Sequence, residues 1–215
     1  IGTLLCVVFD CDLTLRNKLE SMEELFAFDK PMATRQTSAV VLNKLAAVMP
    51  QLMGGSADLA PSNLSDMKDT DEIKYGTFAP DSYEGRNIHF GIREHAMAAI
   101  ANGMQLHGGI QAYCATFFVF SDYCKPAMRL AALMNIPVTY IMTHDSIGVG
   151  EDGPTHEPVE QLISLRSIPG MKVYRPADGK ETAAAWISAI KGTRTTAMVL
   201  SRQNLPQYEI SGLAA

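Results

Sequence analysis

The chain has 215 residues, of which 47% are hydrophobic and 19% charged, so its length and composition indicate a single globular domain with a buried core. Eighteen basic and 23 acidic residues give a net charge of −5, which argues against nucleic acids and anionic membranes as partners, because both favour basic surfaces. The four cysteines form no Cys-x-x-Cys pair, so we expect no disulfide scaffold and no metal site, in a protein of the reducing cytoplasm.

The first 27 residues differ in character from the rest of the chain. Residues 4–9 are apolar, but they are too few for a signal peptide or a membrane span. They run into Asp10-Cys-Asp12-Leu-Thr14, which resembles the first motif of the haloacid-dehalogenase phosphatases, whose two aspartates are a nucleophile and an acid/base. The later lysine and acidic pair of those enzymes are not recognisable, so an active phosphatase is the weakest alternative.

From about residue 30, helical and strand periodicities alternate. The expected helices cover residues 37–50, 94–106, 120–134, 158–167 and 180–191, and the expected strands cover residues 52–56, 87–90, 110–115, 137–143, 171–174 and 196–200. Residues 57–87 are polar and aperiodic, which is typical of a functional or mobile loop. This alternation predicts a doubly wound α/β domain, with a mostly parallel sheet and helices on both faces.

Polar clusters follow several expected strands, at the end where parallel sheets bind ligands. The richest cluster follows the strand 137–143 and contains, among glycines, His144, Asp145, Glu151, Asp152 and His156. Histidines and carboxylates offer proton transfer and hydroxyl binding, and glycines let the backbone approach a ligand closely. A polar surface loop explains the same composition equally well.

Glu94 lies in the first turn of the expected helix 94–106, behind a strand and a glycine. The helix continues with apolar residues, and partial burial would favour the neutral carboxyl group, which suits proton exchange with a ring nitrogen. The more ordinary explanation is an acidic residue favoured by the helix dipole.

The remaining candidates are aromatic or basic. Phe117, Phe120 and Tyr123 recur at intervals of three and are expected to share a helix face, either in the core or against a flat heterocycle. Arg35 precedes the first expected helix and Arg202 follows the last expected strand. Each arginine is either an ordinary surface residue or a bidentate ligand for a phosphate.

Four segments together resemble transketolase, in the order and spacing of its middle, pyrimidine-binding domain. They are GGSADLAPSN from Gly54, GIREH from Gly91, THDSIGVGEDGPTHEPVEQ from Thr143 and LSRQNL from Leu200. The resemblance covers about residues 28–206 and implies the fold of that domain, with residues 207–215 as the start of a linker to a C-terminal domain. SADLAPS and SRQN favour transketolase over the related deoxyxylulose-phosphate synthase.

The resemblance also implies how the cofactor, thiamine diphosphate, is bound at its pyrimidine end. Glu94 matches the glutamate that hydrogen-bonds the aminopyrimidine and drives the proton exchange that activates the cofactor. Phe117, Phe120 and Tyr123 match the aromatic pocket around the pyrimidine, with Phe120 as the expected stacking residue. Asp58 matches an acid near the cofactor and the subunit contact.

The substrates implied by the resemblance are sugar phosphates, between which the family moves a two-carbon ketol unit. His144 and Asp152 match residues that hold the sugar hydroxyls. The cradle for the sugar phosphate is matched by Arg35, Ser62, His156 and Arg202.

One part of the transketolase site has no counterpart in the sequence. Gly-Asp-Gly, with which the preceding domain of the family binds Mg²⁺ or Ca²⁺ and the diphosphate, does not occur. In the family the site lies between two subunits, so we expect half a site, completed in a homodimer or by a diphosphate-binding transketolase domain. We therefore expect the chain alone to be inactive. It is either a fragment of a longer protein, which we favour, or one subunit of a split enzyme. A non-catalytic association module is the alternative, and partner-facing apolar surface predicts self-association of the isolated chain.

Overall fold

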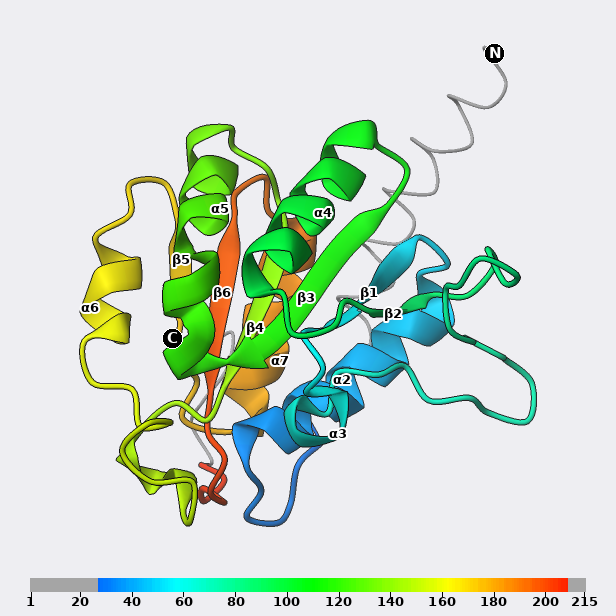
Figure 1. The fold of residues 1–215 in the computed structure, drawn as a ribbon. Coiled ribbons are helices and arrows are strands. Elements are labelled where there is room, and N and C mark those ends of the chain that lie inside the picture. The colour runs from blue at the N-terminus through cyan, green and yellow to red at the C-terminus, as the bar shows by residue number, and fades with distance from the viewer. Residues whose placement is uncertain (1–26, 209–215) are drawn as a thin grey trace.

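In residues 27–208, which the computed structural model describes, six strands form one sheet in which all neighbours are parallel (Figure 1). Its order is β2-β1-β3-β4-β6-β5. The strands are β1 Leu52–Ser56, β2 Asn87–His89, β3 Gln111–Phe117, β4 Thr139–Thr143, β5 Lys172–Tyr174 and β6 Thr196–Leu200. Asp10, Asp12 and residues 209–215, on which some predictions fall, lie outside the described range.

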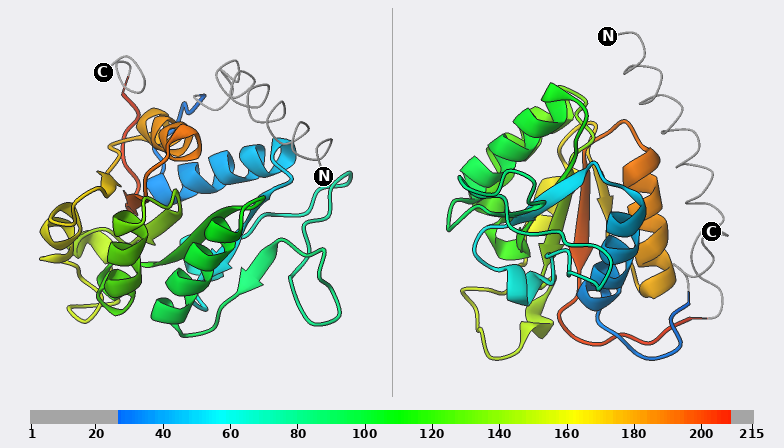
Figure 2. Two further views of the ribbon diagram at one scale, coloured as in Figure 1. Left: turned by 90° about the horizontal axis from the view of Figure 1, so that it is seen from above. Right: turned by 90° about the vertical axis from the view of Figure 1, so that its right-hand side faces the viewer.

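Helices cover both faces of this sheet (Figure 2). They are α2 Thr34–Val48, α3 Ala60–Asn63, α4 Glu94–His107, α5 Ser121–Leu133, α6 Gln161–Arg166 and α7 Gly179–Lys191, with 3-10 turns η2 Phe118–Phe120 and η3 Ile147–Val149. Side chains of α2 and α7 belong to one buried apolar cluster, and side chains of α4, α5 and α6 belong to another. This arrangement confirms the predicted doubly wound α/β fold.

The strands separate the two apolar clusters because their side chains alternate between the faces of the sheet. In β3, Tyr113 and Ala115 pack toward α2 and α7, whereas Ala112 and Cys114 pack toward α4 and α5. Nearly every residue of β3, β4 and β6 is buried, as expected for a parallel sheet that is covered on both faces. The sheet is therefore a rigid base for the residues at its ends.

The first helix begins earlier than the sequence predicts. The sequence pattern places Thr37 and Ser38 at its start, but α2 begins at Thr34. The Thr37 hydroxyl donates to the Thr34 carbonyl oxygen, and Ser38 Oγ accepts a hydrogen bond from Trp186 Nε1 on α7. Both residues are buried, so their polar groups serve the interior of the helix and the packing of α2 on α7 rather than a cap.

The aromatic segment 117–123 also differs from the prediction. Phe117 is the last residue of β3, Phe120 ends the 3-10 turn, and Tyr123 lies in α5. They therefore do not share one helix face, because β3 continues in register with β4 up to the pair Phe117 and Thr143. The turns α3 and η3 were not predicted, and α6 is shorter than the predicted helix 158–167.

Candidate active site

The register of the sheet brings the ends of three strands together. Phe117 of β3 pairs with Thr143 of β4, and Thr143 pairs with Leu200 of β6. The segments that follow these strands therefore begin at one edge of the sheet, where parallel sheets bind ligands. His144 and Arg202, which were predicted from separate motifs, follow β4 and β6 at this edge.

The predicted aromatic residues form a continuous series of rings, although they come from three different elements. The rings of Phe117 and Phe120 are nearly parallel, with centroids 5.9 Å apart, and the centroids of Phe120 and Tyr123 are 5.8 Å apart. His144 packs on Phe117 with centroids 3.8 Å apart, and His156 meets Phe120 edge-on at 5.4 Å. Phe117 is buried, but Tyr123 is 64% exposed, so the series runs from the core to the surface.

His144 combines burial with an unusual backbone. Its φ of 60° lies in the left-handed region, which costs a side chain other than glycine about 1–2 kcal/mol. Its side chain is buried, and its Nδ1 lies 2.9 Å from the Thr143 hydroxyl oxygen. Burial lowers the pKa of His144 to about 4, and the positive charges of Arg35 and Arg202 act in the same direction. The imidazole is therefore neutral at pH 7.

Charged residues from three segments surround His144. Burial lowers the pKa of Arg35, the neighbouring positive charge of Arg202 acts in the same direction, and the negative charge of Asp152 opposes them. The Arg35 guanidinium donates a hydrogen bond to the backbone oxygen of Ser62, which places α2 beside α3. A Cβ atom on Gly150 would lie 3.5 Å from Arg202 Nη1, so the loop with Asp152 packs against that arginine.

Glu94 is the first residue of α4 and is 9% exposed. Burial raises the pKa of the Cys124 thiol to about 12, and the negative charge of Glu94 acts in the same direction. The Glu94 carboxylate therefore lies near Cys124, in the first turns of α5. Within residues 27–208 the Glu94 carboxylate accepts no hydrogen bond. It is a largely buried acid whose hydrogen-bonding capacity is open to a ligand.

Asp58 is the predicted residue that is least connected to the others. It follows β1 in a left-handed backbone conformation, with φ of 60°, and its side chain is exposed. Within the described part of the chain, no hydrogen bond, ion pair or ring contact joins it to the other candidate residues.

Two further side chains make contacts at this edge: Asp145 belongs to the polar cluster expected after the strand 137–143, whereas Asn63 was given no role of its own. Asp145 is buried and accepts a hydrogen bond at Oδ2 from Arg175 Nε at 3.0 Å. Arg175 Nη2 lies 2.9 Å from the same oxygen in an ion pair, so the loops after β4 and β5 are joined. Asn63 is buried and accepts a hydrogen bond from the Thr143 hydroxyl at 2.7 Å. The sequence signal for Asn63 is its place at the end of the motif GGSADLAPSN, beside Ser62.

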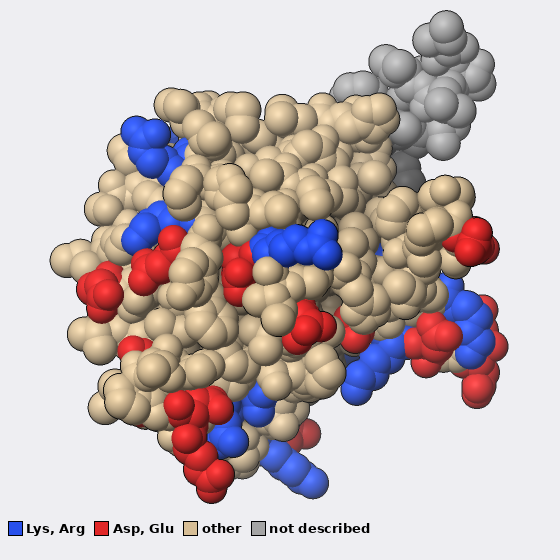
Figure 3. Space-filling view, viewed as in Figure 1, with Lys and Arg blue, Asp and Glu red and all other residues tan. Residues whose placement is uncertain are grey.

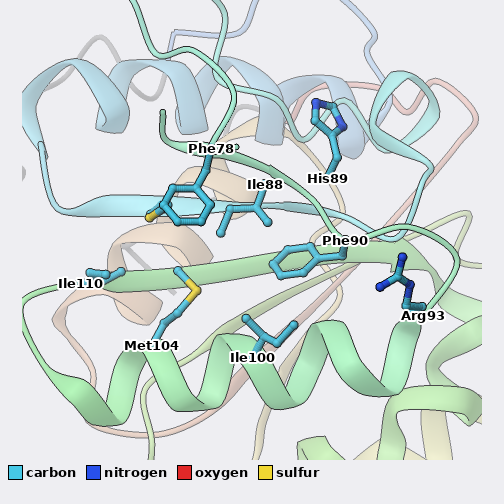
Figure 4. Close-up of a pocket in the computed structure, with 9 residues that line it drawn as sticks. Phe78, Ile88, His89, Phe90, Arg93, Ile100, Met104 and Ile110 are labelled. Carbon is cyan, nitrogen blue, oxygen red and sulfur yellow. The ribbon is translucent and has the colours of Figure 1, made fainter. Parts of the chain in front are cut away.

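A separate apolar pocket of about 390 Å³ lies between α4 and the strands β1 and β2 (Figure 4). Phe78, Ile88, Phe90, Ile100 and Met104 line it. None of the candidate residues contributes to this lining, so the polar site at the sheet edge and the apolar pocket are distinct.

Residues 27–208 show neither a metal site nor a membrane span. They contain no group of three or more histidine, cysteine, aspartate or glutamate side chains placed to hold a metal ion. None of the helices in this range has the length and hydropathy that crossing a membrane requires.

A family model described as the pyrimidine binding domain of transketolase matches residues 30–207. The chain belongs to the transketolase family. It is 56% identical over 188 residues to a transketolase of Geobacillus stearothermophilus and 58% identical over 179 residues to one of Bacillus subtilis strain 168. These alignments cover 87% and 83% of this chain but 27% and 26% of those relatives, so the chain spans about a quarter of their length.

Solved transketolases share the fold of this pyrimidine-binding domain. The transketolase of Pichia stipitis in complex with sedoheptulose 7-phosphate superposes with a TM-score of 0.84 at 44% identity, covering 94% of this chain and 31% of that one. A split-gene transketolase described as an inactive β4 tetramer has a TM-score of 0.65 at 25% identity, covering 83% and 54%.

Proposed function

We propose that this chain supplies the pyrimidine-binding and sugar-phosphate-binding half of a transketolase site, which transfers two-carbon ketol units between sugar phosphates with thiamine diphosphate. The observation that carries the proposal is the position of the aromatic series beside the cluster of Arg35, Arg202 and His144. One wall offers ring surface and the other offers positive charge, which are the two chemistries that a heterocyclic cofactor and a sugar phosphate need.

The side chains present fit the pyrimidine of the cofactor. Phe120 is half-buried between Phe117 and Tyr123, so its ring can stack on a flat heterocycle. The carboxyl group of Glu94 is largely buried and free to hydrogen-bond a ligand, so it can accept a proton from a ring nitrogen or share one with it. When bound, thiamine diphosphate supplies the stabilisation of negative charge at carbon on which ketol transfer depends. The role of Glu94 is to hold and move the proton that the pyrimidine exchanges.

The sugar phosphate is assigned to the polar side of the site. Arg35 and Arg202 can bind the phosphate oxygens through paired N–H groups. Asp152 and His144 can hold hydroxyl groups of the sugar, and His156 lies beside Phe120, between the ring surface and the polar loop. We assign Ser62, whose backbone oxygen accepts a hydrogen bond from Arg35, to the cradle for the sugar phosphate together with His156. Asp58 is assigned to the vicinity of the cofactor and the subunit contact, on the resemblance alone.

We assign the diphosphate and its metal ion to a second domain, as the resemblance to transketolase implies. The surface over α4 and α5 suits such a partner or a second copy of the chain. Several apolar side chains there are exposed, namely Ile100, Leu106, Leu130, Leu133 and Met134. In the view of Figure 3, the upper part of this surface is largely uncharged, and charged side chains lie along its lower part.

A ketol-transfer assay tests the proposal. The chain is incubated with xylulose 5-phosphate, ribose 5-phosphate, thiamine diphosphate and Mg²⁺, first alone and then with a transketolase diphosphate-binding half. We expect activity only in the mixture, and we expect Glu94→Gln to reduce it at least about 100-fold, the lower bound for losing an acid–base group. Glu72→Gln is the matched control, because Glu72 is exposed and lies in the segment between β1 and β2.

Two results would contradict the proposal. Turnover by the chain alone would show that it contains a complete site. A folded chain that stays inactive with the partner half would favour the second candidate, a non-catalytic association module, for which the exposed apolar residues of α4 and α5 are the supporting observation. Binding of the partner half without turnover, measured by sedimentation, would support that module directly.

A further inference from the structure

The loop that follows β4 is tied at its far end to α5. This loop, residues 144–160, leads into α6, whose first residue is Gln161. The side-chain NH₂ group of Gln161 donates to Asp122 Oδ2 at 2.8 Å and has a longer contact of 3.4 Å with Glu160 Oε1. The Gln161 side-chain oxygen accepts the backbone N–H of Val159 at 2.9 Å. Gln161 is 3% exposed, so its buried amide depends on these partners rather than on water.

The carboxylate of Asp122 sets the orientation of the Gln161 amide. An ionised carboxylate can only accept hydrogen bonds, so it holds the NH₂ group and leaves the amide oxygen for the N–H of Val159. Lys125 Nζ donates to Asp122 Oδ1 at 2.9 Å and to Ser164 Oγ of α6 at 2.8 Å. Partial burial of Asp122 opposes its ionisation, but the hydrogen bonds from Lys125 and Gln161 outweigh that effect and lower its pKa.

This anchor connects the two walls of the candidate site. Asp122 lies two residues after Phe120 of the aromatic series. Gln161 lies five residues after His156 of the polar loop. The ring of His156 meets that of Phe120 edge-on, with centroids 5.4 Å apart. The bond between Asp122 and Gln161 therefore closes a ring of chain around this contact and limits how far the loop can move from the aromatic series.

The middle of the loop depends on its two ends for its position. At the start of the loop, Asp145 is bonded to Arg175, which follows β5, and at the end lies the anchor on α5. Between these ends the chain forms the 3-10 turn η3 and then passes through Gly150 and Gly153, with φ of 87° and 76°, which glycine adopts readily. Asp152 lies between these glycines, so the two ends of the loop place its side chain.

We propose that Asp122 is a positioning residue, which acts through Gln161 to hold the loop 144–160 against the aromatic series. The inference rests on the proposed function for the identity of the ligand, a sugar phosphate, whereas the anchor is a property of this chain alone. Neither Asp122 nor Gln161 is assigned to a ligand, so the pair acts through the loop residues that are.

Hydrogen exchange of the full chain tests the anchor. We expect the Val159 amide to be protected in the wild type, and Asp122→Ala to speed its exchange about tenfold, the effect of one hydrogen bond. Asp122→Asn keeps an oxygen that can accept from Gln161, so it should restore most of the protection. Arg129→Ala is the matched control, because Arg129 is exposed on the same helix, and it should leave the exchange unchanged.

Three results would overturn the inference. An unprotected Val159 amide in the wild type would show that the bond to Gln161 does not hold in solution, and this measurement needs no variant to fold. Unchanged exchange in a folded Asp122→Ala variant would show that the loop is held without Asp122. Exchange in Asp122→Asn as fast as in Asp122→Ala would reject the route through Gln161.

The ketol-transfer assay with the partner half separates this inference from the proposed function. In an active enzyme we expect Asp122→Ala to raise KM for ribose 5-phosphate about tenfold, without weakening the binding of thiamine diphosphate. Weaker binding of both would indicate a merely structural role and overturn the inference. The expected exchange of Val159 in an assembled enzyme that is inactive would reject the proposed function but keep the anchor. An active enzyme in which Asp122→Ala leaves that exchange unchanged would do the opposite.

Discussion

At the scale of single residues, His144 joins the two halves of the candidate site. Its ring packs on Phe117 at one side, and its charge state responds to Arg35 and Arg202 at the other. A protonated imidazole would repel both arginines, so the neutral form belongs to the folded state. The pH dependence of stability should therefore report on this cluster.

We predict that His144 makes the folded state less stable in acid. Its pKa is about 4 in the folded chain, against an ordinary value of 6.5 when the chain is unfolded, so the unfolded chain binds more protons between these values. Stability therefore rises with pH in this window and is lost as the pH falls from about 6.5 toward 4, by up to about 1.4 kcal/mol per pH unit. Urea unfolding at several pH values measures this dependence of the unfolding free energy on pH.

The control for this prediction is His144→Gln, which removes the titrating group and leaves the carboxylates that also titrate in acid. The difference in unfolding free energy between the wild type and this variant should decrease as the pH falls from 6.5 to 4. A difference that stays constant over this range would show that His144 protonates equally in both states.

At the scale of secondary-structure elements, a buried polar contact holds α4 against the sheet. The hydroxyl of Tyr140 in β4 donates to Asn102 Oδ1, and Asn102 Nδ2 donates to the Ala127 carbonyl oxygen of α5 at 2.9 Å. This contact joins α4, α5 and β4, and it fixes the helix whose first residue is Glu94.

Tyr140→Phe should lower the free energy of unfolding by about 1–3 kcal/mol, because Asn102 Oδ1 would be left buried without a donor. The matched variant is Tyr174→Phe, which removes the hydroxyl bonded to Ser188 Oγ at a half-buried position. It should cost less than about 1 kcal/mol, since Ser188 can then bond to water. Chemical denaturation of both variants compares them, and equal losses would contradict the role given to burial.

The strand β1 depends on glycine because its neighbours approach closely. A Cβ atom on Gly55 would lie 1.9 Å from the backbone oxygen of Ile88 in β2, so a side chain there forces the two strands apart. We predict that Gly55→Ala destabilises the fold by more than about 3 kcal/mol, at the upper end of overpacking.

Gly103 in α4 provides the control for Gly55. A Cβ atom on Gly103 would meet nothing within 4 Å, and its backbone is helical. Gly103→Ala should therefore stabilise the protein by about 0.5–1 kcal/mol, because alanine favours the helix. Thermal unfolding of the two variants should give shifts of opposite sign, and a tolerated Gly55→Ala would show that β2 can move away.

At the scale of the whole molecule, α4 and α5 together expose several apolar side chains on the same face of the sheet. Leu133 is 67% exposed and Leu130 is 48% exposed. A surface of this kind is typical of an interface with a partner or with a second copy of the chain.

We predict that the isolated chain self-associates through α4 and α5. Leu133→Lys should shift the distribution of sedimentation coefficients toward the monomer, because it places a charge in the predicted interface between two copies. Val40→Lys in α2, on the opposite face of the sheet, should leave the distribution unchanged. A monodisperse wild-type monomer at micromolar concentration would contradict this prediction.

The amino-acid sequence by itself determined the fold class, the order of strands and helices along the chain and the family, because these depend on local periodicity and on contiguous motifs. It misplaced the start of α2 and the element of Phe117, since capping and strand extension depend on partners in other segments.

The contacts within the site were decided only by the tertiary structure. Asn63 and Thr143 are 80 positions apart, and they meet because the parallel register aligns the ends of the central strands. Asp145 and Arg175 meet because β4 and β5 both pair in parallel with β6, so the loops that follow them begin at the same end of the sheet. No local pattern encodes the order of strands in the sheet, so the hydrogen-bond partners of Thr143 and Asp145 could not be named from the sequence alone.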